Sequence, residues 1–329
     1  MTATAISPWR LTLAYALDLA AGDPEWFPHP VRVMGIAISA GERRLRSARD
    51  GRMGRTFKGA ALAGAVVAGS WCVTRAILRR SAKPDSRRSV LVEVVLAWTT
   101  LATRSLLSEA GAVLAALDAG DLDRARTRLS RIVGRDTANL EEGEIARAVI
   151  ETVAESACDG IVAPLTWLAI GGVPAAFAYK AANTLDSMIG HPEPPYRNFG
   201  RAAARLDDAA NLLPARLTAL LIVASAFLAG YDARSAWRVW RRDGGKHASP
   251  NAGQCEAAMA GALGVRLGGV NQYDDKPVRS HLLGAEGRQA ARTDARGALR
   301  IAATASALAF GAALFCCAWR ARKSGDLAR

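Results

Sequence analysis

Charged residues gather on both sides of a long uncharged segment near the middle of the chain. Before that segment, four of them stand at four-residue spacing: Arg147, Glu151, Glu155 and Asp159. On a helix this spacing forms one stripe, and like charges along such a stripe repel each other and destabilise the helix. Carboxylate oxygens are ligands that Mg²⁺ accepts. The stripe therefore predicts a site for Mg²⁺ or a polar substrate, with a solvated helix face as the alternative.

A second polar set follows the uncharged segment, which runs from residue 160 to residue 179. It comprises Lys180, Asn183, Asp186, Arg205, Asp207 and Asp208. The first three stand three residues apart, within one arc of a helix, so a cation and a carboxylate occur together there. This combination suits phosphate and metal recognition. The alternative is a network of surface ion pairs, each of which stabilises a helix only slightly.

A third candidate lies further along, at residues 246–251. Ser249 followed by Pro250 predicts a helix N-cap with proline at the first helical position, so that a helix opens at Asn251. A helix N-terminus beside Lys246 and His247 would attract an anion. The alternative is an ordinary capped helix with a basic approach.

The composition indicates that these residues belong to a membrane protein. Half of the 329 residues are hydrophobic and only 6% are aromatic, and the mean hydropathy is slightly positive. The net charge of +13 favours anionic partners, and arginine-rich loops beside membrane spans account for most of it. No basic patch interleaved with aromatic residues and no zinc-finger pattern occurs, so nucleic acid is not an expected partner.

Apolar runs alternate with polar segments along the chain. They occupy residues 8–21, 59–78, 90–107, 160–179, 212–231 and 301–319. Since about 20 apolar residues span a bilayer, we expect an all-α, polytopic integral membrane protein with about five hydrophobic segments. The expected organisation is a single membrane-embedded domain over residues 1–329. Polar helical segments are expected at residues 108–159 and 232–300.

The uncharged segment at residues 160–179 contains Gly171-Gly172-Val173-Pro174. Proline in a helix interior removes a hydrogen bond and clashes with the preceding turn, so this sequence predicts a break. Broken backbone at membrane depth is tolerated where protein or a water-filled cavity surrounds it. A re-entrant hairpin or a discontinuous helix here would bring the two charged sets to the same side of the membrane.

The familiar signatures of nucleotide and hydrolytic sites are missing from the sequence. There is no Walker A motif, no GxGxxG, no GxSxG and no HExxH. The five cysteines form no CxxC pair, which argues against a disulfide framework or a zinc site. Chemistry with ATP or a metal would therefore use another arrangement.

Several longer motifs resemble the adenosylcobinamide-phosphate synthase family of cobalamin biosynthesis. They run in order from about Asp18 to Tyr273. They are Asp18 with Gly22-Asp23-Pro24 and His29-Pro30-Val31, Arg135-Asp136-Thr137, Asp159–Pro164, Tyr179–Met188, Ala204–Asp208, Ser249–Gly253 and Glu256–Met259. Motifs of this length and number rarely coincide by chance.

The resemblance implies a multi-pass enzyme of the cell inner membrane. It implies ATP-dependent joining of (R)-1-aminopropan-2-ol phosphate, or free aminopropanol, to the free propionate carboxyl of adenosylcobyric acid, with Mg²⁺. The product would be adenosylcobinamide or its phosphate. The expected partners are these substrates, ATP, membrane lipids and other late corrinoid-pathway membrane enzymes.

Roles are assigned at positions that match the family motifs. The expected catalytic carboxylates are Glu155, Asp159 and Asp186. The expected metal ligands are Asp207 and Asp208. The expected substrate and phosphate ligands are Lys180, Asn183, Arg205, Lys246, Ser249 and Asn251. The chain departs from the family at Ser156, where an asparagine is expected, while Asp159 is retained.

Two functions of other classes fit some of the same features. A secondary transporter would also place a broken helix flanked by charges near the middle of the membrane. Many transporters are built from paired repeats, and none is visible in this sequence. The other alternative is a non-catalytic membrane scaffold for corrinoid enzymes.

Overall fold

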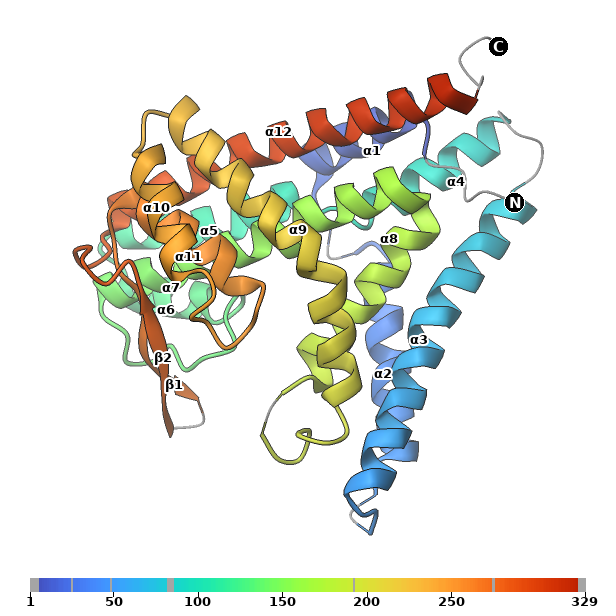
Figure 1. The fold of residues 1–329 in the computed structure, drawn as a ribbon, viewed down its shortest axis with the longest axis horizontal. Coiled ribbons are helices and arrows are strands. Elements are labelled where there is room, and N and C mark those ends of the chain that lie inside the picture. Colours follow the sequence, from blue (N-terminus) through green and yellow to red (C-terminus); the bar gives the residue numbers. More distant parts are fainter. Residues whose placement is uncertain are drawn as a thin grey trace. The chain divides into compact units, whose positions relative to one another are not determined.

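The computed structural model describes residues 6–24, 26–47, 49–81, 86–191, 193–273 and 276–324. The described chain is predominantly helical (Figure 1), which confirms the all-α fold class. It divides into two compact units, each built from separate stretches of sequence. The first unit contains Met1–Ala102, Ala163–Asn211 and Phe310–Arg329, and the second contains Thr103–Val162 and Leu212–Ala309. The expectation of one membrane-embedded domain stays a prediction.

Five helical stretches are long and apolar enough to cross a membrane. They are Arg52–Arg80, Arg87–Asp118, Glu142–Ile189, Arg201–Leu228 and Arg292–Lys323. Helix α1 (Pro8–Ala21) begins and ends where the sequence predicts it. Its 14 residues are fewer than the roughly 20 that a span requires. The number and type of the spans confirm a polytopic membrane protein.

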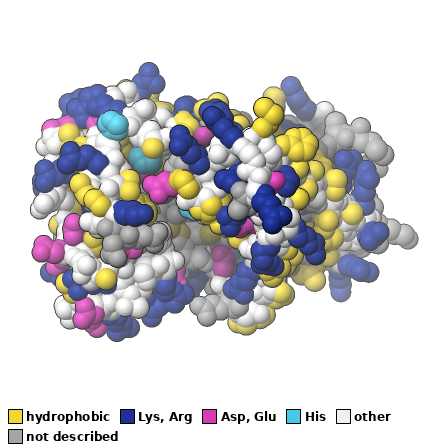
Figure 2. Space-filling model, turned by 90° about the horizontal axis from the view of Figure 1, so that it is seen from below, with side chains coloured by type: hydrophobic (Ala, Val, Ile, Leu, Met, Phe, Trp, Pro, Cys, Tyr) yellow, Lys and Arg dark blue, Asp and Glu magenta, His cyan; other side chains and the backbone are white. Residues whose placement is uncertain are grey.

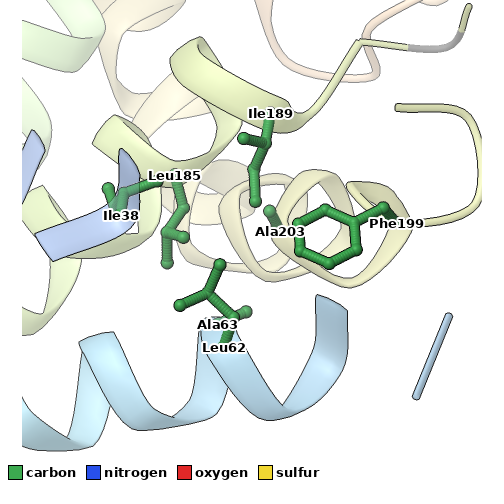
Figure 3. Packing of buried hydrophobic residues seen from close by; sticks show 7 residues of the cluster. All are labelled: Ile38, Leu62, Ala63, Leu185, Ile189, Phe199 and Ala203. Carbon is green, nitrogen blue, oxygen red and sulfur yellow. The ribbon is translucent and has the colours of Figure 1, made fainter. Parts of the chain in front are cut away.

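The first unit is organised around α8 (Ala163–Ile189) and α3 (Arg52–Arg80), with α2 (Pro30–Leu45) beside them. Apolar side chains from these helices, from the turn before α9 (Arg201–Leu228) and from the start of α9 form a buried core (Figure 3). Its members are Ile38, Leu62, Ala63, Leu185, Ile189, Phe199 and Ala203. This packing fixes the C-terminal half of α8, which carries part of the second polar set.

Helix α4 (Arg87–Trp98) packs against α1 within the same unit. The indole of Trp98 donates to the Gly22 carbonyl at 3.1 Å, and Arg10 forms an ion pair with Glu93. The Tyr15 ring stacks on that of Phe310 at 4.3 Å between centroids. The charges of Arg10 and Glu93 are therefore paired with each other. Charged residues in membrane proteins are usually paired in this way and not exposed to lipid.

The predicted break in α8 is confirmed at Gly172. Its φ of 68° and ψ of −167° lie outside the helical region, in a conformation that is essentially restricted to glycine. Pro174 follows within the helix. Just upstream, α7 (Glu142–Ala157) leads into a π-helical turn, η1 (Cys158–Val162), which contains Asp159. Such turns occur frequently at functional sites.

The second unit contains α5 (Thr103–Asp118), α6 (Leu122–Leu129), α7 and the pair α10 (Ala233–Asp243) and α11 (Ala252–Leu263). Helices α10 and α11 lie side by side in Figure 1, and they pack closely. Helix α12 (Arg292–Ser324) starts in this unit. Thr103 and Ser306 are joined by a buried hydroxyl contact of 3.2 Å.

One part of the predicted helical segment 232–300 is wrong. Strands β1 (Leu267–Tyr273) and β2 (Lys276–Leu283) form an antiparallel hairpin. Gly268 has a φ of +83°, and a β-carbon there would lie 2.2 Å from the His281 carbonyl oxygen. Close backbone approach at a positive φ suits glycine and excludes a helix at this point.

Basic side chains are prominent on the surface. Lys and Arg, dark blue in Figure 2, cover much of the face in view. The chain carries 43 of them against 30 Asp and Glu. This excess agrees with the expectation of anionic lipid partners, which stays a prediction.

Candidate active-site pocket

The second unit contains a polar pocket of about 290 Å³. The loop after α6, one face of α7, the segment before α11, α11 itself and the β-hairpin all line it. Its ionisable side chains are Arg135, Glu151, Glu155, His247, Glu256 and Tyr273. Of the predicted site residues, only Glu155 lies in this lining.

Glu151 lies at the centre of an ion-pair network on one wall. Arg147 Nη1 donates to its Oε1 at 3.0 Å, and Arg135 Nη2 donates to its Oε2. The Gly268 amide also donates to Oε1 at 2.8 Å. Both guanidinium groups donate to Asn271 Oδ1 as well, Arg147 at 2.9 Å. The network ties α7 to the hairpin.

This network corrects one interpretation of the sequence. The four-residue spacing of Glu151, Glu155 and Asp159 predicted mutual repulsion, with a bound cation or polar substrate as one explanation and a solvated helix face as the other. Two arginines neutralise Glu151 in the structure, and one of them, Arg135, comes from a loop that helical spacing does not reveal. Glu151 is therefore neutralised within the protein, and Glu155, an exposed residue of the same helix, also lines the pocket.

Glu256 projects from α11 into the same pocket, although it is only 6% exposed. Burial, followed by the charges of Glu151 and Glu155, raises its pKa well above the usual range. The nearest partner recorded for its carboxylate is His247 Nε2, at 4.0 Å from Oε1. That distance is too long for a hydrogen bond.

His247 is held by its other ring nitrogen. Nδ1 accepts a hydrogen bond from the Ser249 amide at 3.0 Å, which leaves the proton of the neutral ring on Nε2, the nitrogen nearer Glu256. Burial lowers the pKa of His247. The neutral ring therefore predominates at neutral pH and adds no charge to the pocket.

The predicted cap before α11 is confirmed only in part, because the N-cap residue is Asn251, whose side chain makes no capping hydrogen bond, and Pro250 lies before the helix. Ser249 Oγ accepts hydrogen bonds from the amides of Asn251 and Ala252, both at 3.2 Å. The helix itself begins at Ala252, one residue later than expected. The N-terminus of α11 has the positive end of a helix dipole, which favours anions, and the phosphate role of Ser249 and Asn251 stays a prediction.

Lys246 has a partner within the protein. Its Nζ donates to Asp243 Oδ1 at 2.6 Å, and Arg242 and the Gly284 amide donate to the same buried carboxylate. The neighbouring Arg242 and Lys246 hold the pKa of Asp243 well below its usual range. Lys246 therefore helps to neutralise a buried charge, and its phosphate role stays a prediction.

The second polar set lies in the first unit, where α8 meets α9. Asn183 Nδ2 donates to Asp207 Oδ1 at 3.3 Å, and Asn211 Nδ2 donates to both Asp207 oxygens at 3.1 Å. The Tyr179 hydroxyl fixes Asn211 by donating to its Oδ1 at 3.0 Å. Lys180 acts electrostatically on Asp207, and Arg205 acts on Asp208. Lys180, Asn183 and Asp207 are thus brought together between α8 and α9, with Arg205 near Asp208.

Metal ligands would come from the acidic, histidine and cysteine side chains that the structure describes. Among them, no three His, Cys, Asp or Glu residues form a group that could hold a metal ion. Mg²⁺ often binds through one or two carboxylates together with substrate phosphates. Asp207 and Asp208 offer two carboxylates of that type, and their role as Mg²⁺ ligands stays a prediction.

Sequence reasoning did not predict Glu256 as a site residue, and it placed His247 only beside the expected anion site. The signal for Glu256 was present, because it is the one charged residue within Ala252–Leu263, a helix of small and apolar residues. A lone carboxylate at a buried helix position is costly unless it has a function or a partner. For His247 and Arg135, only the tertiary packing shows that they line this pocket.

The fold and the site define a class of protein: a helical membrane protein with several spans and a polar pocket lined by ionisable side chains. The chain matches the family model described as CobD/Cbib protein over residues 11–302. It therefore belongs to the CobD/CbiB family and has a role in cobalamin biosynthesis.

Individual relatives agree with this assignment. The chain is 47% identical to cobalamin biosynthesis protein CobD of Geobacter metallireducens, over 88% of this chain and 90% of the relative. It is 44% identical to CobD of Citrobacter koseri, over 90% and 93%. It is 42% identical to cobalamin biosynthesis protein CbiB of Salmonella typhimurium, over the same shares. No solved structure gave a match.

Proposed function

We propose that this protein forms an amide bond between the free propionate carboxyl of adenosylcobyric acid and (R)-1-aminopropan-2-ol phosphate or aminopropanol, at the expense of ATP. Within a family of cobalamin biosynthesis proteins, the observation that supports it most is the pocket of the second unit. It combines a buried carboxylate, Glu256, with an exposed one, Glu155, and a neutral imidazole. Such groups suit the acceptance of a proton from an amine.

The proposed reaction needs an activated carboxyl, because a carboxylate is a poor electrophile. A carboxylate oxygen would attack the γ-phosphorus of ATP, giving an acyl phosphate and ADP. The amine nitrogen, after losing a proton, would then attack the acyl carbon. The carbon–oxygen bond to phosphate breaks, and the amide and inorganic phosphate leave.

The protein's own residues supply binding and charge in this scheme. Lys180 and Arg205 are the proposed ligands of phosphoryl oxygens in the first unit, and the capped N-terminus at Ser249 is the proposed anion site in the second. Mg²⁺, bound to Asp207 and Asp208, would neutralise negative charge on the phosphates. We place the protein in the inner membrane as a multi-pass enzyme.

A reconstituted assay tests this proposal. Purified protein in detergent is incubated with adenosylcobyric acid, each of the two amines in turn, and Mg-ATP, and the corrinoid is analysed by mass spectrometry. We expect the amide mass to appear only when ATP is present. The comparison of the two amines identifies the preferred substrate.

The confirmed break at Gly172 also suits a transporter, so the assay includes that alternative. The same protein is reconstituted in vesicles and corrinoid uptake is measured. Corrinoid uptake without amide formation would indicate a transporter. The absence of both activities would favour a non-catalytic scaffold.

A further inference from the structure

The exposed face of α10 is strongly basic. Arg234, Arg238 and Arg241 stand four and three residues apart, so they lie on one side of the helix, and all three are exposed. The opposite side, which includes Ala236 and Val239, is buried. Helix α10 is therefore amphipathic, and its exposed side carries three cations.

These three arginines differ from the fourth arginine of the helix in having no partner. Arg242 donates to Asp243 Oδ2 and to Glu286 Oε2, both at 2.7 Å. Across the ranges that the structure describes, no ion pair or side-chain hydrogen bond involves Arg234, Arg238 or Arg241. Their charge is thus uncompensated within the described chain and favours an anionic partner.

A tryptophan lies among these arginines. Trp237 is 47% exposed, and its ring packs edge-on against Trp240 at 5.2 Å between centroids. Trp240 in turn donates to Gln254 Oε1 of α11 at 2.9 Å. Tryptophan is enriched where a membrane meets water, and basic residues are attracted to the headgroups of anionic lipids there. The combination on one face therefore favours a lipid surface over bulk water.

Helix α10 also begins close to the end of a membrane-spanning stretch. The stretch Arg201–Leu228 is long and apolar enough to cross a membrane, and only residues 229–232 separate it from α10. Its last two residues, Phe227 and Leu228, are 76% and 62% exposed, as apolar side chains that face lipid would be. The start of α10 therefore lies near the layer of headgroups that borders the hydrocarbon core.

The connection between the two helices is a compact turn (Figure 1). The Tyr231 amide donates to the Ala226 carbonyl at 2.7 Å, and Gly230 has a φ of 77°, which are features of a helix C-terminal motif closed by glycine. Asp232 then caps α10, because its Oδ1 accepts from the Ser235 amide at 2.8 Å. Both ends of the turn are hydrogen-bonded, so α10 is held close to the end of α9.

We propose that the basic face of α10, formed by Arg234, Trp237, Arg238 and Arg241, lies on the membrane surface and binds the anionic headgroups of phospholipids. The guanidinium groups donate to phosphate oxygens, and the indole lies at the level of the headgroups. Helix α10 packs against α11, which carries Glu256 into the polar pocket. The contact therefore holds this wall of the pocket near the membrane surface.

Arginine modification in wild-type protein tests this proposal without any variant. The full-length protein is reconstituted in nanodiscs of phosphatidylcholine alone, or of phosphatidylcholine and phosphatidylglycerol in equal parts. Phenylglyoxal modifies accessible arginines, and peptide mass spectrometry measures the rate at each position. Arg266 and Arg279 serve as internal controls, because they are exposed residues of the same unit that do not adjoin a span.

Phosphatidylglycerol should slow the modification of the three arginines about fivefold, the factor that corresponds to about 1 kcal/mol per arginine at an anionic surface. Arg266 and Arg279 should react at the same rate in both bilayers. High salt should reduce the protection, because it screens exposed charges. Equal modification of the basic face in both bilayers would overturn the proposal and would favour an acidic protein as its partner.

A soluble phosphate distinguishes a lipid headgroup from a free phosphate ligand. Glycerol phosphate is added to the protein in phosphatidylcholine nanodiscs, and the modification is repeated. We expect no protection of the basic face, because a single soluble phosphate lacks the surface of an anionic bilayer. Protection as large as that given by phosphatidylglycerol would contradict a membrane contact.

A second measurement counts the lipids that remain bound. Protein is released from the mixed bilayer into detergent, and native mass spectrometry measures the phosphatidylglycerol retained. In one variant the three arginines of the face are replaced by glutamine. The control variant removes the same charge elsewhere in the unit, by Arg266→Gln, Lys276→Gln and Arg279→Gln.

The variant of the basic face should retain less phosphatidylglycerol than wild type, and the control should retain as much as wild type. Equal loss in both variants would mean that net charge, and not this face, retains the lipid, and would contradict the proposal. Neither measurement requires ATP or a corrinoid, so the result does not depend on the proposed reaction.

Discussion

Two arginines donate hydrogen bonds to the Glu151 carboxylate: Arg135 from the loop after α6, and Arg147 from α7, the helix that also carries Glu151. All three side chains are largely buried, with 7%, 13% and 11% of their area exposed. Buried charges of this kind are sensitive to the loss of one partner, because the other is left uncompensated. The network therefore fixes the wall that faces Glu155 and Glu256.

Replacement of Arg135 tests this view of the network. Arg135→Ala should lower the free energy of unfolding by about 3 kcal/mol, the usual cost of breaking a buried ion pair. The control is Arg131→Ala in the same loop, since Arg131 forms an exposed ion pair with Glu109 and should cost less than about 1 kcal/mol. Denaturant unfolding in detergent measures both, and equal effects of the two changes would contradict a structural role for the network.

Glu256 should destabilise the folded protein as the pH rises. Its pKa is raised in the folded state, so between the unfolded and the folded pKa the folded state binds more protons and stability falls with increasing pH. Glu256→Gln removes this effect, and the variant should unfold at a higher temperature than wild type near neutral pH. The difference should shrink towards pH 4.5, as glutamate becomes protonated in both states. A difference that grows on acidification would mean that the pKa is not raised.

Asp186 lies on α8 within the longest motif shared with the family. Asp186→Asn keeps the shape and removes the charge, so amide formation should fall by at least about 100-fold if this carboxylate acts on a proton or a bound cation. Ser187→Ala, an exposed neighbour, is the control and should retain activity. Membrane fractionation confirms insertion of both variants, and near-normal turnover of Asp186→Asn would remove this residue from the site.

At the scale of elements, the break in α8 is a feature that the sequence predicts and the structure confirms. The break at residues 171–174 was predicted from proline and glycine, and it occurs at Gly172. Gly172→Ala should destabilise the protein by about 1–3 kcal/mol, because alanine is strained in this conformation. Gly69→Ala in the open interior of α3 has nothing within 4 Å and is the control, with an expected effect near zero or stabilising. Thermal unfolding in detergent measures the stability of both variants. An unchanged stability of Gly172→Ala would contradict the backbone geometry.

The elements predicted well are those that local pattern determines. Long apolar runs predicted the spans, and Ser249-Pro250 predicted the start of α11 to within one residue. The β-hairpin at residues 267–283 was missed because its pairing joins two strands through contacts that no local pattern shows, and because it packs against α11. The same holds for the residues of the pocket. Glu155 was predicted from helical spacing, whereas Arg135 and Glu256 join the pocket only through tertiary packing.

At the scale of the whole molecule, the predicted site residues belong to two units. Lys180, Asn183, Asp186, Arg205, Asp207 and Asp208 lie in the first, and Glu155, Asp159, Lys246, Ser249 and Asn251 lie in the second. The proposed phosphate and metal ligands of the first set remain predictions, as does the role of the polar pocket of the second unit. A reaction that joins an amine to a phosphate-activated acid needs both phosphate binding and the removal of a proton from the amine.

The most direct test of that reaction follows the carboxylate oxygens. Adenosylcobyric acid labelled with oxygen-18 in its free carboxyl is converted with aminopropanol phosphate and Mg-ATP, and the inorganic phosphate is analysed by mass spectrometry. An acyl phosphate intermediate predicts that each amide formed is accompanied by one labelled phosphate. Amide formation with unlabelled phosphate, or no amide at all, would contradict the account.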